Sequence, residues 1–247
     1  MNTSVSWPTQ RAIRGSMSFS AIVDIDGVHN PKTGGFHVVQ DALDAKHNHI
    51  FVKKGTYPGF NNTRNGVTIC GESMNDTLFD GTPKGEHAVT NTGAWCHFSN
   101  FKMRTAAGGV GAHKDGVNDT GSANLYERIL MTECDNVAFH FVSGGAGVSV
   151  VRDCVAYSAI DSYKIYLEQP SCHIFGGYIA NAGSYGLEIG ALGDNAIVQG
   201  VMFAANTTYS IRIHADAENC IVDGVRATGA SISDGSGTSV IGDNDTT

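Results

Sequence analysis

The chain has 247 residues, 31 glycines and a formal net charge of −8. This length fits one large all-β domain or two small domains. The negative charge argues against nucleic acid or an anionic membrane surface as a partner, because phosphate binding needs clustered Lys and Arg. The sequence has no run of about 18 apolar residues, so no membrane-spanning helix is predicted.

The N-terminal part of the chain divides at residue 36. Residues 1–35 are interpreted as an N-terminal extension, and their opening lacks the basic-then-apolar pattern of a signal peptide. Residues 36–48, FHVVQDALDAKHN, place apolar side chains at helical spacing, which predicts a short amphipathic helix that caps the open end of a solenoid. HIFVKKGTYPG then indicates a first strand with a glycine turn, and residues 66–81 indicate the next coil.

The rest of the chain repeats one short pattern. SYGLEIG at 184–190 and TYSIRIH at 208–214 each carry a tyrosine followed by an apolar, a charged and another apolar residue. The apolar pair recurs as Phe139/Phe141, Ile165/Leu167, Leu187/Ile189 and Ile211/Ile213. A second column is formed by Asn100, Asp153, Gly177, Gly200 and Gly224. Both columns repeat at about 23 residues, which indicates a repeat architecture.

This period predicts the fold class. It is too short for propeller blades, and the chain lacks the spaced leucines of a leucine-rich repeat. It favours an all-β fold over residues 36–247, a single-stranded right-handed parallel β-helix whose coils each supply about three strands. Strand alternation then puts the apolar pairs inside. Because Val137, Tyr163, Tyr185 and Tyr209 share their parity, we expect the tyrosines to form a structural stack near a corner rather than a sugar platform.

The six cysteines are predicted to be buried free thiols. They form no CxxC pair, and several occupy apolar positions, as in CHIF and CIVDGV. Cysteine in such positions behaves as a small hydrophobic residue, which argues against a disulfide framework or a metal site. No metal or other cofactor is predicted.

The first coils resemble a known superfamily. VVQDALDA, IFVKKGTYPGF and GVTICGESMNDTLFDG, all within residues 36–81, resemble the opening of pectin-lyase-like β-helix proteins, which include pectinesterases, polysaccharide lyases and phage tailspikes. FKMRTAAG at 101–108 is similar to pectinesterases in particular. Their catalytic DFIFG-like strand and GRPW-like segment are absent, so the resemblance implies the β-helix fold without implying methylesterase activity.

Alternation also predicts three columns on the outer face of one parallel sheet. The central column is His140, Tyr166, Glu188 and Arg212. The two flanking columns are Ala138, Lys164, Gly186, Ser210 and Val142, Glu168, Gly190, His214. Glu188 and Arg212 are expected to pair across adjacent coils. The small residues are expected to leave a groove for an extended polysaccharide, contacted by Tyr166, Glu168, Glu188, Arg212 and His214.

Three interpretations of these columns stay open. In a β-elimination on a uronic acid, His140 or Lys164 would be the base, Tyr166 the acid and Arg212 the cation that opposes the carboxylate. Hydrolysis would instead use a carboxylate pair, Glu168 and Glu188. The third interpretation is a solvated ladder of charges without a ligand. The glycine-rich insertion at 105–123, with its His113, Lys114 and Asp115, is either a second functional position or a plain loop.

Two classes of function follow from these observations. We predict a glycan-recognising β-helix of phage-virion or bacterial-surface type, similar to a tailspike or a capsid decoration protein. A polysaccharide and other virion proteins would be its partners, a homotrimer its assembly, and the virion or the extracellular space its location. The alternative is a polysaccharide lyase or glycoside hydrolase that acts on an acidic polysaccharide.

Overall fold

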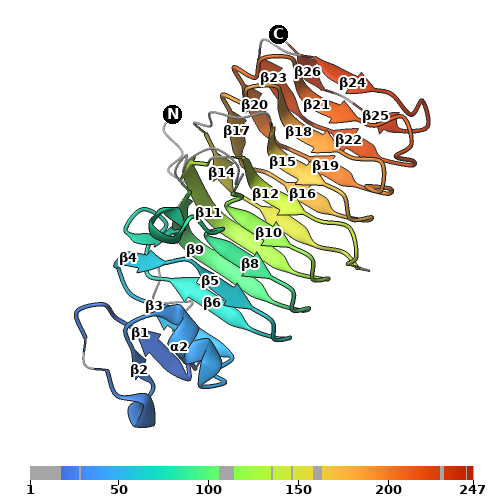
Figure 1. Cartoon of the computed structure of the whole chain (residues 1–247). Coiled ribbons are helices and arrows are strands. Elements are labelled where there is room, and N and C mark those ends of the chain that lie inside the picture. The colour runs from blue at the N-terminus through green and yellow to red at the C-terminus, as the bar shows by residue number, and fades with distance from the viewer. Residues whose placement is uncertain are drawn as a thin grey trace, which may run out of the picture.

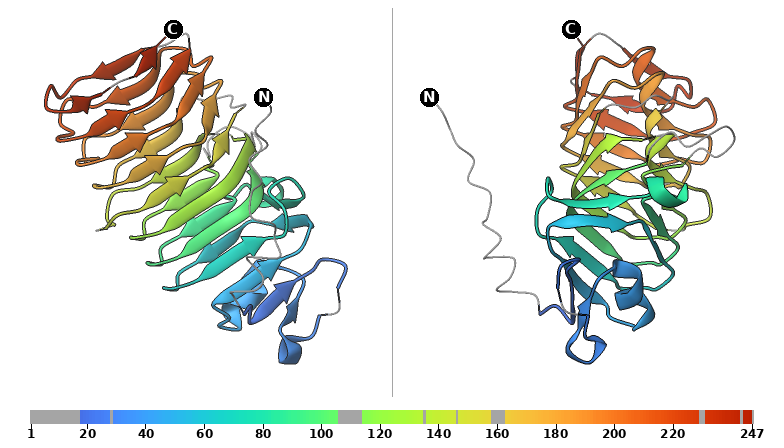
Figure 2. Two further views of the ribbon diagram at one scale, coloured as in Figure 1. Left: turned by 180° about the vertical axis from the view of Figure 1, so that it is seen from behind. Right: turned by 60° about the vertical axis from the view of Figure 1, so that its left-hand side comes forward.

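The computed structural model describes residues 18–27, 29–105, 114–134, 136–145, 147–157, 163–228, 231–242 and 244–246. In these residues the regular structure is almost entirely parallel β-strand, wound into successive coils (Figure 1). The coils stack along one axis, from the N-terminal strands at one end to the C-terminal strands at the other (Figure 2). The predicted all-β parallel solenoid is therefore confirmed.

Strand pairing between coils forms three ladders. The first contains β1 (Ala21–Val23), β3 (His49–Val52), β6 (Thr68–Gly71), the first part of β9 (His97–Arg104) and of β11 (Leu125–Glu133), β13 (Val150–Arg152), β16 (His173–Phe175), β19 (Ile197–Gln199), β22 (Ile221–Asp223) and β25 (Val240–Ile241), with β2 (Gly35–Phe36) beside β1. The second contains β4 (Gly55–Pro58), β7 (Thr77–Asp80), the later parts of β9 and β11, β14 (Val155–Ala156), β17 (Tyr178–Ala180), β20 (Met202–Ala204), β23 (Arg226–Thr228) and β26 (Asp245–Thr246).

The third ladder is an eight-stranded sheet, and it carries the candidate site. Its strands are β5 (Phe60–Asn62), β8 (Val89–Asn91), β10 (Val117–Asp119), β12 (Val137–Phe141), β15 (Tyr163–Leu167), β18 (Tyr185–Ile189), β21 (Tyr209–Ile213) and β24 (Ile232–Asp234). Because β1 pairs in parallel with β3, coil stacking begins within the segment that was interpreted as an N-terminal extension.

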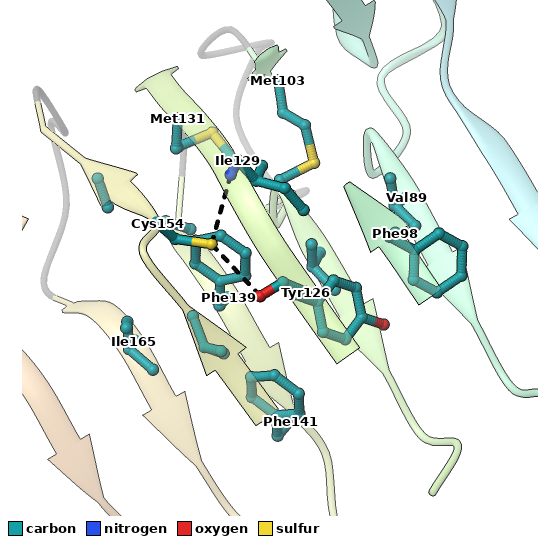
Figure 3. Packing of buried hydrophobic residues seen from close by; sticks show 14 of the residues in the cluster. Val89, Phe98, Met103, Tyr126, Ile129, Met131, Phe139, Phe141, Cys154 and Ile165 are labelled. Carbon is teal, nitrogen blue, oxygen red and sulfur yellow. Dashed lines mark hydrogen bonds between the residues drawn. The ribbon is translucent and has the colours of Figure 1, made fainter. Parts of the chain in front are cut away.

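The interior follows the predicted apolar ladder. Phe139, Ile165, Leu187 and Ile211 are aligned in register, as are Phe141, Leu167, Ile189 and Ile213. All eight side chains are buried. In Figure 3, Phe139 and Phe141 lie beside Tyr126 of β11, with ring centroids 6.3 and 5.6 Å from that of Tyr126, so side chains from two walls of the solenoid meet in its interior. Burial of this apolar surface is the main favourable contribution to stacking one coil on the next.

The second predicted column marks a corner of the coil. Asn100, Asp153, Gly200 and Gly224 all have left-handed backbone, with φ between 52° and 65°. The register of the preceding strands aligns Gly176, rather than the predicted Gly177, with these residues. Gly, Asn and Asp recur here because they adopt a positive φ at the lowest steric cost.

The predicted capping helix is present but shorter than expected. Helix α2 spans Val39–Asp44 and packs against β1, β2, β3 and β5, with Val39, Ala42 and Leu43 buried. Phe36 belongs to strand β2, and two 3-10 helices occur at Pro31–Thr33 and Thr82–Lys84. The helix ends before 48 because Lys46 has a positive φ of 66°. Arg64 Nη1 then donates hydrogen bonds to the carbonyls of Leu43 and His47.

The N-terminal half of the interior contains a polar ladder that the sequence analysis did not anticipate. Asn62 Nδ2 donates to Asn91 Oδ1 at 2.8 Å, and Asn91 Nδ2 donates to Asp119 Oδ1 at 2.9 Å. Asn124 Nδ2 contacts both Asp119 oxygens. Burial raises the pKa of Asp119, although these donors oppose the shift. The next residue in register is Phe141, where this ladder becomes apolar.

All six cysteines are buried free thiols, as predicted. Burial raises the pKa of Cys154 and of Cys172 to about 12, so neither is a thiolate near neutral pH. Cys154 Sγ accepts a hydrogen bond from the backbone N–H of Ile129 (Figure 3). Among the described residues, no helix is long and apolar enough to span a membrane.

Candidate functional site

The central column of the eight-stranded sheet has the predicted register. His140, Tyr166, Glu188 and Arg212 lie in sequence on four adjacent strands, and Ser233 of β24 continues the column. Arg212 Nη1 lies 3.1 Å from Glu188 Oε1, so the predicted ion pair is formed. The column brings four chemically different side chains to one face of the solenoid, one from each coil.

The tyrosine column faces outward, which corrects its expected inward direction. Tyr163, Tyr185 and Tyr209 are half-buried, and their rings stack at centroid distances of 5.4 and 5.9 Å. Tyr166 stacks on Tyr163 at 5.4 Å and on His140 at 5.2 Å. The five rings form one continuous stack. Their faces are occupied by neighbouring rings, so the stack offers ring edges and hydroxyls rather than a flat sugar platform.

Lys164 does not lie on the outer face, so its predicted position there is wrong. Lys164 is only 1% exposed. In β15, Tyr163 and Ile165 each have register partners on both neighbouring strands, whereas Lys164 is missing from both registers. The strand therefore departs from strict alternation at Lys164. A Cβ added to Gly186, the next residue in the same column, would lie 2.7 Å from Phe203 Cδ1 in the core. The column therefore points inward, and Lys164 cannot act as a surface base.

The small residues do not line a groove as expected. Ala138, Gly186 and Ser210 belong to the inward column and are buried. Gly190 is in the other flanking column, where a Cβ would lie 2.9 Å from Tyr166 Cε2. The Tyr166 ring thus covers Gly190, and the space left by the missing side chain is occupied.

His140 is held between two carboxylates. Its Nδ1 lies 3.0 Å from Asp115 Oδ2, and its Nε2 lies 3.1 Å from Glu168 Oε2. Asp115 comes from the segment before β10, and Glu168 directly follows β15. We call Asp115, His140 and Glu168 the His140 cluster. An imidazolium satisfies both contacts at once, because both of its ring nitrogens are donors.

Asp115 is the most constrained member of the His140 cluster. Its Oδ2 accepts a hydrogen bond from Asn118, and its Oδ1 accepts bonds from Asn136 Nδ2 and the Val137 N–H. Its own N–H donates to His87 Nδ1 at 2.8 Å. Burial opposes the charge of Asp115, but the hydrogen bonds from His140 and Asn118 outweigh it and lower its pKa. Asp115 is therefore ionised at neutral pH.

Burial and neighbouring charges also shift the pKa values of His140, Tyr166 and Glu188. Burial alone would lower the pKa of His140, but the hydrogen bonds and charges of Asp115 and Glu168 raise it overall. Burial and the Glu168 carboxylate raise the pKa of Tyr166 well above its usual value. Burial also raises the pKa of Glu188, against the influence of Arg212. The site thus holds carboxyl groups in two different environments.

The other predicted site residues do not belong to the His140 cluster. Arg212 Nη1 also donates to Tyr185 Oη at 3.3 Å, which fixes the guanidinium beside the ring stack. His214 has its ion-pair contact with Asp216 in the following turn, at 3.5 Å. His113 lies outside the described residues. Asp115 was noted in the sequence only as a loop residue, and its role needed the neighbouring coil to become visible.

Asn118 and His87 are site residues that sequence reasoning missed. Asn118 pairs in register with His140, so extending the central column one coil toward the N-terminus would have found it. His87 lies before β8 and shares no repeat position with the column. Only its contact with Asp115 identifies it.

Comparisons with known proteins place the fold. No protein-family model and no curated protein sequence matches the chain. A pectin methylesterase variant in complex with a hexasaccharide is 11% identical, with a TM-score of 0.61 over 87% of this chain and 81% of its own. A pectin methylesterase from Aspergillus niger is 14% identical, with a TM-score of 0.57 over 94% and 86%. The A-module of a mannuronan C-5 epimerase from Azotobacter vinelandii is 14% identical, with a TM-score of 0.46 over 87% and 75%. The chain has the pectin-lyase-like right-handed parallel β-helix fold.

Proposed function

We propose that the chain is a glycan-recognising β-helix whose ligand lies across the outer face of the eight-stranded sheet. The observation that carries this proposal is the His140 cluster with Tyr166 stacked on its imidazole. These polar side chains are held by one another before any ligand arrives, which reduces the entropy cost of binding. Tyr166, Glu168, Glu188 and Arg212 are the proposed contacts, with His214 at the edge.

The architecture also supports an extended ligand. Equivalent residues on adjacent coils lie about 4.8 Å apart, so one elongated chain of sugars can contact several coils in succession. One of the proteins with the same fold is a pectin methylesterase in complex with a hexasaccharide. A hydroxyl-rich ligand suits the edges and hydroxyls of the ring stack, together with the donors of Arg212.

Hydrolysis is the catalytic alternative that a specific observation favours. Glu188 is only 5% exposed and has a raised pKa, which suits a general acid, whereas Glu168 is more exposed. Glycoside hydrolysis uses two carboxyl groups whose environments differ in this way. Elimination has less support, because Lys164 is buried and both ring nitrogens of His140 face carboxylates, which disfavours the neutral base.

The finer expectations about biological setting stay predictions. A phage-virion or bacterial-surface location, other virion proteins as partners and a homotrimer fit a glycan-recognising β-helix. Light scattering on the full chain tests the trimer directly.

Glycan binding is tested by a glycan array followed by titration of the ligands that bind. Tyr166→Ala and Arg212→Ala should each weaken binding about ten-fold, because each removes a charged or aromatic contact. Tyr178→Ala and Arg152→Ala are the matched controls. Tyr178 lies on β17 of another ladder, and Arg152 is 46% exposed and paired with Glu127, much as Arg212 is 37% exposed and paired with Glu188.

The same samples decide between recognition and catalysis. New reducing ends would indicate hydrolysis, and ultraviolet absorbance of unsaturated uronates would indicate elimination. Binding that survives both site variants but falls with either control variant would contradict the proposed face. No binding to any glycan would contradict the proposed function itself.

A further inference from the structure

The charges on this face are unevenly balanced. In the described part of the chain, Arg212 pairs with Glu188, and His214 pairs with Asp216. His140 is shared between Asp115 and Glu168. One imidazolium between two carboxylates leaves one negative charge in excess.

The excess charge is accessible at Glu168. The Asp115 side chain is 3% exposed and bound by several donors, whereas the Glu168 side chain is 30% exposed. A ligand that approaches the sheet therefore meets Glu168 as its most exposed carboxylate near Tyr166.

We infer that this site selects a saccharide that carries a protonated amine, seated on the Glu168 carboxylate beside the Tyr166 ring. The inference rests on the proposed glycan-binding function. An ammonium group would neutralise the excess charge of the His140 cluster and would donate charge-assisted hydrogen bonds to the Glu168 carboxylate. A uronate would instead bring a third carboxylate toward Glu168 and Glu188, and like charges at such distances repel.

The geometry also links this ligand to a proton. The groups that face His140 are Asp115, Glu168, Tyr166 and, behind Asp115, His87. An ammonium on Glu168 competes with the imidazolium for the same carboxylate. Binding of a cationic saccharide should therefore release a fraction of a proton from His140. Binding of an anionic saccharide should instead increase the fraction of His140 that is protonated.

The test compares three hexasaccharides of different charge on the full chain by calorimetry at about pH 6, where amines are protonated. The probes are a glucosamine hexamer, an N-acetylglucosamine hexamer and a galacturonate hexamer. The glucosamine hexamer should bind about ten-fold more tightly than the neutral hexamer, and the galacturonate hexamer most weakly. Repeating the titration in two buffers of different ionisation enthalpy measures the proton released.

Glu168→Gln isolates the carboxylate. It should remove the advantage of the glucosamine hexamer over the neutral hexamer, whatever the change in the affinity for the neutral hexamer itself. Glu133→Gln, an exposed substitution at the end of β11, should leave the advantage intact.

Three outcomes overturn the inference. Tightest binding of the galacturonate hexamer would do so while leaving the proposed function standing, provided that Tyr166→Ala weakens that binding. An unchanged glucosamine advantage in Glu168→Gln would move the site away from Glu168. Absence of binding by all three hexamers would overturn it as well, and binding of other glycans on the array would then decide whether the proposed function survives.

Discussion

The Tyr166 ring covers Gly190 so closely that a Cβ atom there would approach Cε2 to 2.9 Å. The ring is also stacked between His140 and Tyr163, so it has little room to retreat. The absence of a side chain at Gly190 therefore leaves the space that the Tyr166 ring occupies.

Gly190→Ala should displace the Tyr166 ring and weaken glycan binding by several-fold to about ten-fold. In the Tyr166→Ala background the same substitution should have almost no further effect, because the ring that it displaces is absent. Titration of the two single variants and the double variant measures this coupling. Additive losses would show that Gly190 acts independently of Tyr166.

Leu187→Ala should lower the free energy of unfolding by about 2–5 kcal/mol, because it opens a cavity in the interior ladder. Urea unfolding of the variant and the wild type measures the difference. A loss below about 1 kcal/mol would contradict the tight packing of this ladder.

Glu188→Gln should change the free energy of unfolding by only about 1 kcal/mol or less. Its carboxyl was expected to be exposed but is buried, and the cost of burying its charge offsets the attraction to Arg212. Urea unfolding at neutral pH checks this. A loss equal to that of Leu187→Ala would indicate a strongly stabilising ion pair.

His140 should make stability fall as the pH rises. Its folded pKa is raised above the unfolded value, so its contribution is fully present below about pH 6.5 and is lost as the pH rises through the folded pKa. The difference in urea midpoint between the wild type and His140→Gln should therefore shrink from about pH 6 to about pH 9. A difference that grows over this range would contradict the bridging imidazolium.

Glu127 should affect stability in the acidic pH range, where stability should fall as the pH falls. Hydrogen bonding to His97 and the charges of Arg128 and Arg152 lower its pKa to about 2, against burial. Its contribution is present above its unfolded pKa and is lost as the pH falls toward 2. Urea midpoints of wild type and Glu127→Gln should thus converge as the pH falls below about 4.5.

The inward position of Lys164 is tested by chemical labelling. An amine acylating reagent should modify the exposed ammonium of Lys53 in the native protein and leave Lys164 unmodified until urea unfolds the chain. Peptide mass spectrometry measures both rates. Equal acylation rates for the two lysines in the native protein would contradict the inward position of Lys164.

The repeat was predictable because coils must bury equivalent side chains. Phe139, Ile165, Leu187 and Ile211 recur at the coil period, and that spacing is visible in the sequence alone. The Glu188–Arg212 pair followed from the same alignment. Its burial did not, because exposure depends on neighbouring side chains as well as on strand parity.

The predictions were wrong where the direction of a side chain depends on local backbone irregularity or on contacts between coils. Strict alternation placed Lys164 outside and Tyr163 inside, and one irregular strand position reversed both. Asp115 joins His140 across coils at a separation of 25 residues, from a segment that carries no repeat pattern. The helix was expected to begin at residue 36. Phe36 instead belongs to strand β2, because pairing with β1 satisfies its backbone hydrogen-bonding groups.

The interior polar ladder of Asn62, Asn91 and Asp119 makes the two halves of the solenoid unequal in their capacity to change length. An amide at this position needs a matching donor and acceptor on both neighbouring coils, so an inserted coil must carry Asn or Asp at the same register. Beyond Phe141 the same register is filled by Leu167, Ile189 and Ile213, which any apolar neighbour can satisfy. Gain or loss of whole coils by gene duplication and deletion is therefore expected to occur in the C-terminal half, which also carries Tyr166, Glu188 and Arg212.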